Sequence, residues 1–262
     1  MDTNYIQIGK PEHSYFIGFI QADGHLQSSS RNRGKLTLEI RIEDAHILGD
    51  FTKMFPDVYS SIWYRIRDTN FKDGSETKTL TICNLEFRNE LLKAGITYGR
   101  KSDTVRKPQG VVDVDYFRGL LDGDGSLGIT SQGFPYTSLV TISEKCATEY
   151  IDFLEPITGK RKTASRNQRD GAFNIMVTKE DAQKLVYKLY YPECLCLERK
   201  RKSAIEVLSW KRPEGMERRE SGKKWDDGQD AFILEHSTKE SMEVLGRSKS
   251  SIETRLWRLN KQ

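Results

Sequence analysis

Residues 16–24 read FIGFIQADG and residues 117–125 read FRGLLDGDG, so one nine-residue pattern occurs twice in the chain. Each copy is an apolar run with a glycine at its third position, and each ends in Asp-Gly. The two aspartates, Asp23 and Asp124, are 101 residues apart. The repeat predicts a duplicated half-domain with one acidic residue in each copy.

Small residues recur four positions apart in both copies: Gly18 and Ala22, then Gly119 and Gly123. Residues at this spacing share one face of a helix, and small side chains on that face let two backbones approach closely. We therefore predict that the two helices pack against each other. Both aspartates would then emerge together at the C-terminal end of the pair.

Two neighbouring carboxylates repel each other unless a cation lies between them. A Mg²⁺ ion held by carboxylate oxygens, water and a substrate phosphate is the usual solution. The plainer alternative is a pair of helix-capping aspartates in an amphipathic repeat. The matched positions of the two copies favour the metal site.

With these residues the chain resembles the LAGLIDADG homing endonucleases, in the single-chain form with two motifs. The resemblance implies that the small residues form the contact between the halves, and that Asp23 and Asp124 are catalytic residues that bind a divalent metal beside the scissile phosphate. It implies Mg²⁺ as cofactor, with Mn²⁺ able to substitute and Ca²⁺ supporting binding without cleavage. The sixth motif position, often acidic in that family, is Gln21 in one copy and Asp122 in the other.

The resemblance also implies an α+β fold of two pseudo-symmetric αββαββα halves, with antiparallel sheets that form a DNA-binding saddle. We assign residues 1–105 and 115–210 to the halves and 106–114 to a linker. Residues 35–42 alternate between apolar and polar side chains, which is typical of a half-buried strand. In the second half, residues 136–143, 161–166 and 172–178 read as strands and 145–154 and 179–190 as helices.

Composition sets limits on the class of protein. With 36% hydrophobic and 31% charged residues, the chain has ordinary globular composition and has no run long enough for a membrane span. Its four cysteines, including the pair Cys194 and Cys196, lack zinc-site spacing, so we expect reduced thiols and a cytoplasmic location. A bacterial or phage origin is expected, with an organelle as the alternative.

The net charge of +4 does not by itself indicate a nucleic-acid partner, but the basic residues are clustered. Lysine neutralises phosphates, and arginine also forms paired hydrogen bonds to guanine. Each cluster alone can be a solvated loop or strand edge, whereas their matching placement in both halves favours DNA contact. The predicted contacts are Arg31, Arg33, Lys35, Arg41, Arg65 and Arg67 in the first half, and Lys160, Arg161, Lys162, Arg166 and Arg169 in the second.

Two lysines, Lys101 and Lys200, each follow the last predicted helix of a half. They resemble the basic position near the metal centre of the family. A lysine there can orient the attacking water, lower its pKa, or stabilise the charge that grows on the phosphate. The alternative is a cation that complements the dipole at a helix C-terminus.

The C-terminal region reads as a separate module. Residues 211–224 are polar and contain proline and glycine, which predicts a linker. Residues 225–262 predict three short helices, with a capping box at Ser237 and a turn at Gly246. The module resembles a Myb-like or phage-type helix-turn-helix, although such a unit can also bind protein. Its predicted DNA contacts are Arg247, Ser248, Lys249, Thr254 and Arg258, with Ser251 on the same face.

Together these features predict a monomeric, site-specific endonuclease of double-stranded DNA, with no membrane partner. The resemblance implies a staggered double-strand break in a long, asymmetric target. Two alternatives stay open at this point: an intron RNA maturase, and a DNA-binding transcriptional regulator without cleavage. The chain opens with Met and has no splicing nucleophile at residue 1, which favours a free-standing or intron-encoded enzyme over an intein.

Overall fold

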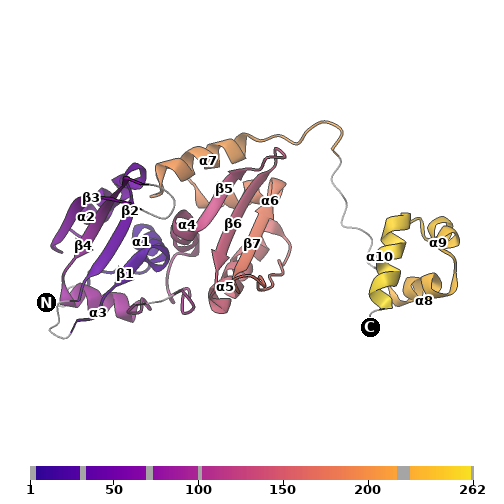
Figure 1. Ribbon diagram of the computed structural model, residues 1–262, viewed down its shortest axis with the longest axis horizontal. Helices are drawn as coiled ribbons and strands as arrows, with labels where there is room; N and C mark the ends of the chain where they lie inside the picture. The colour runs from indigo at the N-terminus through magenta and orange to yellow at the C-terminus, as the bar shows by residue number, and fades with distance from the viewer. Residues whose placement is uncertain (1–3, 30–33, 69–72, 100–101, 217–224, 261–262) are drawn as a thin grey trace. The chain divides into compact units, whose positions relative to one another are not determined.

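The computed structural model describes residues 4–29, 34–68, 73–99, 102–216 and 225–260. The chain divides into two compact units, Met1–Trp210 and Lys211–Gln262. The first unit contains two antiparallel sheets with helices packed on them, so the predicted α+β class is confirmed (Figure 1). Among the described residues, no helix is long and apolar enough to cross a membrane.

The first half of this unit follows the predicted αββαββα order, and its sheet has the strand order β1-β2-β4-β3. In β2 the side chains alternate as expected, with Leu36, Leu38 and Ile40 buried against the helices. Its elements are α1 (Pro11–Ala22), β1 (Gly24–Leu26), β2 (Leu36–Arg41), a 3-10 turn (Ile42–Asp44), α2 (His46–Met54), β3 (Ser60–Arg67), β4 (Ser75–Ile82) and α3 (Leu85–Lys93).

Aromatic side chains form the core of the first half. Phe16 of α1 packs edge-to-face on Phe51 and Phe55, with ring centroids 4.9 Å apart in both pairs. Phe87 of α3 lies 4.9 Å from Phe55 and closes the cluster. Because edge-to-face pairs add to the burial of apolar area, this cluster fixes α1 against α2 and α3 of its own half.

The second half has a sheet of three strands in the order β5-β6-β7. Its core again centres on a phenylalanine of the motif helix: Phe117 lies 5.2 Å from Tyr150 and 4.6 Å from Phe153. The elements are α4 (Asp113–Asp124), β5 (Gly125–Ile129), β6 (Pro135–Thr141), α5 (Glu144–Thr158), β7 (Phe173–Thr178), α6 (Lys179–Leu189) and α7 (Glu198–Ser209).

The strand predicted at residues 161–166 is wrong. That segment is irregular and joins β7 only through an isolated bridge between Arg166 and Phe173. It begins Arg-Lys-Thr and offers no alternating apolar side chains to bury, so the tight turn at residues 167–171 closes a hairpin that does not extend. The second half is therefore αββαβα followed by α7.

Helix α7 was not predicted. Its inward positions are Lys200, Ala204 and Val207, which have the spacing of one helical face and are all buried. Because Lys200 takes one of the buried positions where an apolar residue is expected, the sequence does not show the apolar periodicity of an amphipathic helix. Figure 1 places α7 along one edge of the second half, beside α4 and β5.

The second unit contains the three predicted helices, α8 (Asp227–Glu235), α9 (Thr238–Leu245) and α10 (Lys249–Leu259). The capping box forms between Ser237 and Glu240, and Gly246 ends α9 with a φ of 60°. Ile233 and Ile252 form the buried centre, with exposed fractions of 2% and 0%. A core this small leaves most of the helical surface available for contacts.

Candidate functional site

The motif helices α1 and α4 lie side by side between the two sheets, in direct backbone contact (Figure 1). A Cβ atom added to Gly18 would lie 2.1 Å from the carbonyl oxygen of Tyr116, and one added to Gly119 would lie 2.2 Å from that of Tyr15. At Gly123 the added atom would lie 2.4 Å from the Cβ of Ala22. Side chains larger than those present at the predicted interface positions therefore clash.

Two reciprocal hydrogen bonds flank this contact. The hydroxyl of Tyr15 donates to Asp122 Oδ2 at 2.8 Å, and that of Tyr116 donates to Gln21 Oε1 at 2.5 Å. Both tyrosines are fully buried, and burial raises the pKa of each phenol well above its ordinary value. Neither tyrosine was predicted from the sequence to take part in the site. The available signal was that the repeat extends one residue before the quoted motif, since Tyr15 and Tyr116 are also 101 residues apart.

Asp23 and Asp124 lie at the C-terminal ends of the paired helices, and both side chains are exposed. Asp23 caps α1, and Asp124 is the last residue of α4. The Asp23 carboxylate reaches the end of α4, because its Oδ2 lies 3.3 Å from the position of a Cβ on Gly123. Two carboxylates are thus added to two helix ends that already carry partial negative charge, which makes the position attractive to a cation.

Lys200 is buried beside this pair. Its Nζ donates to the carbonyl oxygens of Leu121, at 3.0 Å, and of Gly125, at 2.5 Å, so it spans the last turn of α4. Burial lowers the pKa of Lys200 to about 8, while the charges of Asp122, Asp44 and Asp23 oppose that shift. The expected position after the last helix is wrong, because Lys200 lies inside α7. Its predicted counterpart, Lys101, falls outside the described residues.

Asp122 supports this site without being exposed to it. Its carboxylate accepts hydrogen bonds from the hydroxyls of Tyr15 and Tyr190 and from the backbone N–H of Leu197, at 2.8, 2.6 and 2.8 Å. Burial raises the pKa of Asp122, and these three donors and the charge of Lys200 oppose that shift. The carboxylate therefore joins both motif helices to the segment that leads into α7.

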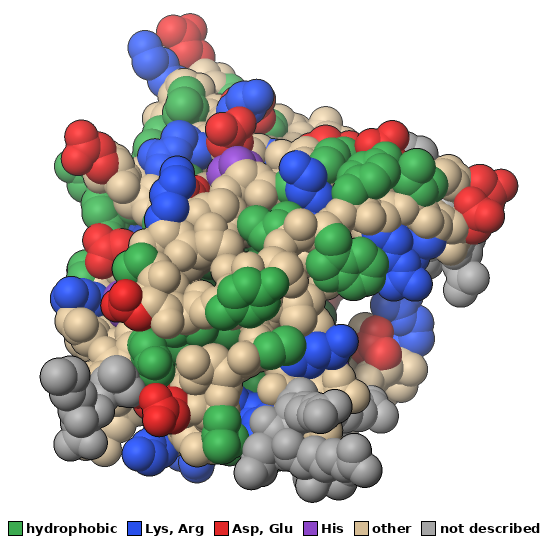
Figure 2. All heavy atoms as spheres, turned by 90° about the vertical axis from the view of Figure 1, so that its left-hand side faces the viewer, with side chains coloured by type: hydrophobic (Ala, Val, Ile, Leu, Met, Phe, Trp, Pro, Cys, Tyr) green, Lys and Arg blue, Asp and Glu red, His purple; other side chains and the backbone are tan. Residues whose placement is uncertain are grey.

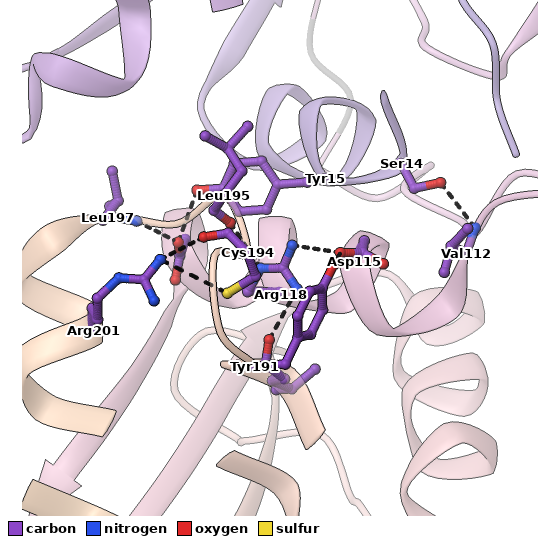
Figure 3. Close-up of polar contacts among 12 residues, drawn as sticks. Ser14, Tyr15, Val112, Asp115, Arg118, Tyr191, Cys194, Leu195, Leu197 and Arg201 are labelled. Carbon is purple, nitrogen blue, oxygen red and sulfur yellow. Dashed lines mark hydrogen bonds and ion pairs between the residues drawn. The ribbon is translucent and has the colours of Figure 1, made fainter. Parts of the chain in front are cut away.

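Arg118 also binds the segment that leads into α7, through hydrogen bonds to backbone carbonyl oxygens (Figure 3). Its guanidinium donates to the carbonyl oxygens of Leu195 and Leu189, at 2.8 and 2.9 Å, and pairs with Asp115 at 2.5 Å. The side chain is completely buried. A buried arginine with a carboxylate partner and two carbonyl acceptors holds its surroundings in one arrangement, because any displacement would leave a buried charge uncompensated.

A third set of polar contacts joins the second half to the first. Arg199, at the start of α7, donates to Asp44 Oδ2 at 2.8 Å, and His46 Nε2 lies 3.4 Å from the carbonyl oxygen of Cys196. Asp44 is 4% exposed. These contacts hold the beginning of α7, and with it Lys200, against the 3-10 turn and α2 of the first half.

A pocket of about 350 Å³ opens beside Asp124. Burial raises the pKa of the Cys146 thiol in its wall to about 12, with a smaller contribution from Asp124, so this thiol is inert at neutral pH. The lining residues are Gln21, Ala22, Ser102, Val105, Leu120, Asp124, Leu139, Val140, Thr141, Ile142 and Cys146.

The described residues contain no group of three or more His, Cys, Asp or Glu side chains that could hold a metal ion. The two exposed aspartates fit Mg²⁺ only as a partial ligand set. Such a set suits this ion, which usually keeps several waters and binds through one or two carboxylates together with substrate phosphates.

Most of the cations predicted to contact DNA pair with nearby acids. Figure 2 looks onto the first half and shows that the blue and red side chains on this face are interspersed and are not gathered into one large basic patch. Lys35 is half-buried and Lys160 exposed, whereas Arg31 and Arg33 lie outside the described residues. The pairs are Arg65 and Arg67 with Glu39 (3.9 and 3.3 Å), Arg41 with Asp44 (3.9 Å), Arg161 with Asp152 and Glu155 (2.8 and 2.7 Å), Lys162 with Asp181 (3.9 Å), Arg166 with Glu144 (3.5 Å) and Arg169 with Asp170 (3.0 Å).

In the second unit, Ser248, Lys249, Thr254 and Arg258 are exposed at or along α10, and Ser251 is half-buried. Arg247 is half-buried, and its guanidinium packs within the unit. It lies 4.0 Å from the ring of Trp225 and donates to Gln229 at 2.6 Å. The arginine thus closes the small core, and breaking these contacts would uncover the indole ring.

No family model and no curated protein matches the chain. Solved structures with a similar fold include the homing endonuclease I-WcaI bound to its DNA recognition sequence, with 15% identity, a TM-score of 0.48, and 78% of this chain and 91% of that chain covered. Mesophilic variants of the homing endonuclease I-DmoI align with 14% identity and a TM-score of 0.49, over 73% and 96%. Full-length DUF199/WhiA from Thermatoga maritima aligns with 13% identity and a TM-score of 0.48, over 98% and 94%.

Proposed function

We propose that this chain is a divalent-metal-dependent endodeoxyribonuclease that makes a staggered double-strand break in a long, asymmetric DNA target. One observation carries the proposal: two exposed carboxylates end two helices that are in backbone contact, and a buried lysine lies against the end of α4. The two strands of a duplex are related by local two-fold symmetry. A pair of equivalent acids from a duplicated fold therefore matches the two scissile phosphates.

Each side chain has a definite role in this proposal. Asp23 and Asp124 would hold Mg²⁺ together with phosphate oxygens, and the ion when bound supplies Lewis acidity and lowers the pKa of a coordinated water. Lys200 is held by two carbonyl oxygens, and a pKa near 8 gives it access to both protonation states at working pH. It therefore can orient the water or stabilise the charge on the phosphate. Lys101 takes the corresponding role by analogy of position.

The test is cleavage of a random DNA library by the full chain, followed by sequencing of the cut ends. Asp23→Asn and Asp124→Asn should each abolish double-strand cleavage in Mg²⁺ or Mn²⁺ with little change in DNA affinity, because the carboxylates bind metal and form no part of the sheets. Ca²⁺ should support binding alone. Lys200→Met should slow cleavage by on the order of 10².

Asp50→Asn is the matched control, since Asp50 pairs with Lys53 within α2, at 3.8 Å, away from the paired motif helices. It should cut like the unaltered chain. Full cleavage by Asp23→Asn or Asp124→Asn would contradict the metal-ligand assignment.

A non-cleaving DNA-binding regulator is the second candidate. The three-helix unit favours it, because the exposed Thr254 and Arg258 share one face of α10 and the exposed Lys249 lies at its first residue. In this case the library would yield bound sequences and no cut ends in any metal. The internal pseudo-two-fold arrangement supports a monomer in both cases.

A further inference from the structure

The segment between α6 and α7 contains two cysteines, Cys194 and Cys196, that the proposed cleavage chemistry does not use. Both are free and buried, with exposed fractions of 4% and 6%, and each thiol shifts the pKa of the other. The backbone turns sharply just before them, since Glu193 has a φ of 61° and the N–H of Cys194 donates to the carbonyl oxygen of Tyr191. The turn brings the two thiols together.

Cationic groups surround the first of these thiols. Arg201 Nη2 lies 4.0 Å from Cys194 Sγ, and the same arginine donates to the Cys194 carbonyl oxygen at 2.5 Å. The hydrogen bond from Cys196 and the charges of Arg118 and Arg201 lower the pKa of Cys194 to about 7, while Cys196 is shifted in the opposite direction. The pair thus has the asymmetry of a nucleophilic thiol and a resolving thiol.

A pocket adjoins Cys194. Its volume is about 320 Å³, and its other walls include the Arg118 guanidinium and the Tyr191 ring. Figure 3 shows the Cys194 sulfur between Arg201 and Arg118. The pocket is many times larger than a water molecule, so an oxidant of that size fits beside Cys194.

The backbone around these cysteines is a junction of the fold. The carbonyl oxygen of Cys194 accepts from Arg201, and that of Leu195 accepts from Arg118. The carbonyl oxygen of Cys196 faces His46, and the N–H of Leu197 donates to Asp122. Lys200 follows within the first turn of α7. A bond between the two side chains would shorten this segment and disturb the contacts that position the lysine.

We infer that Cys194 and Cys196 form a peroxide-reactive dithiol that closes to a disulfide across the segment leading into α7. The Cys194 thiolate attacks one oxygen of hydrogen peroxide, the O–O bond breaks, and the departing hydroxide takes a proton to become water. Cys194 is then a sulfenic acid. The Cys196 thiolate attacks its sulfur, the S–O bond breaks, and a second water leaves with the proton of that thiol. Two thiols and one peroxide thus give one disulfide and two waters.

The chain contains its own controls. Cys146 is buried with a pKa raised to about 12, and Cys83 is exposed directly after β4, outside any C-x-C pair. In the full-length protein at neutral pH, Cys194 should react with iodoacetamide on the order of tenfold faster than Cys146, as its thiolate character requires. Equal rates for these two thiols would count against the inference.

The decisive measurement is peptide mass mapping after treatment with about one equivalent of hydrogen peroxide. Residues 189–199 form one tryptic peptide that holds both cysteines and no other. It should lose two hydrogens, and dithiothreitol should restore them. Cys196→Ser should accumulate a sulfenic acid at Cys194 that dimedone traps, whereas Cys194→Ser should leave Cys196 unmodified. An unaltered peptide in the treated wild-type chain would overturn the inference.

The consequence for DNA cleavage rests on the proposed function. Oxidation should abolish cutting reversibly in the wild type and in Cys83→Ser, and should spare a Cys194→Ser, Cys196→Ser double variant. The mass and dimedone readouts need no cleavage, so they test the dithiol even if the chain proves to be a regulator. Disulfide formation without loss of cutting would contradict the expected effect on DNA cleavage and leave the reaction of the two thiols with peroxide standing.

Discussion

The two halves of the first unit agree where they touch each other and differ immediately outside that contact. Both contribute a glycine that meets the backbone of the opposite helix and a tyrosine that donates across the junction. The acceptors differ, however: Gln21 also donates to the carbonyl oxygen of Arg106, whereas Asp122 collects three donors. The sheets differ as well, with four strands against three. The close contact constrains both sequences, and residues beyond it are free to diverge.

The largest effect should come from filling the shared contact. Gly18→Ala or Gly119→Ala places a methyl group about 2 Å from a backbone oxygen, which neither helix can accommodate without moving apart. Each should lower the free energy of unfolding by about 3 kcal/mol or more, the upper range for overpacking. Urea denaturation measures it. Gly49→Ala on α2, where an added Cβ meets nothing within 4 Å, is the control and should be neutral or slightly stabilising.

Equal stabilities of Gly18→Ala and Gly49→Ala would show that the halves are not in backbone contact. A large effect at Gly18 alone would show that the junction is less symmetric than the structure has it.

A second experiment measures the pH dependence of stability that Lys200, in the second half, contributes. Because the folded pKa of about 8 lies below the ordinary value of 10.5, the unfolded chain binds more protons between these values. Stability contributed by this group should therefore rise as pH increases from 8 to 10.5, by up to about 3 kcal/mol. The readout is the difference in unfolding free energy between the wild type and Lys200→Met across that range. A constant difference would place Lys200 in solvent.

A third prediction concerns the divergent acceptors. Asp122→Asn exchanges one acceptor oxygen for a donor that faces other donors, and should cost about 2–3 kcal/mol of stability. Gln21→Met strands one hydroxyl and one carbonyl oxygen and should cost about 1–2 kcal/mol. Thermal unfolding of both variants at neutral pH compares them. A larger loss of stability in Gln21→Met than in Asp122→Asn would contradict the expectation that the acceptor with more hydrogen-bond donors contributes more.

The smallest effect should follow removal of the second unit, which belongs to neither half. Truncation should fall after Lys211, because Trp210 is part of the first unit: its Nε1 donates to Gly133 O at 2.8 Å and its carbonyl oxygen accepts from Gln183. The shortened chain should fold and cut. Its DNA affinity should drop roughly tenfold, with a smaller salt dependence, since a tethered second module raises the local concentration of contacts.

The footprint of the full chain should also extend beyond that of the truncated chain on one side only. Lys249→Gln with Arg258→Gln in the full chain is the matched variant and should reproduce the lower affinity. An unchanged footprint, affinity and salt dependence would assign the second unit to another partner.

The sequence predicted those features that depend on neighbours along the chain. The motif helices, the alternation in β2 and the capping box of α9 each follow from local spacing, which is preserved in the folded state. The features that it did not predict depend on distant partners. Lys200 is buried because two carbonyl oxygens of α4 receive it, and Arg247 turns inward because Trp225 offers a ring. No period or motif encodes such pairings.

The reciprocal tyrosines also determine how this molecule can be recombined. Tyr15 and Tyr116 occupy equivalent places, and each donates to the side chain at the sixth motif position of the opposite helix. A chain with two copies of the second half would keep both bonds, each with a carboxylate as acceptor. Two copies of the first half would keep both bonds with amide acceptors, but would place an alanine at the Gly123 position, where its Cβ would lie 2.4 Å from that of Ala22. At this junction the second half can therefore replace the first, whereas the first half cannot replace the second without a clash. Chimeras that join the first half to a half from a related gene should therefore assemble when the partner brings a tyrosine, a polar acceptor and glycines at the positions of Gly119 and Gly123.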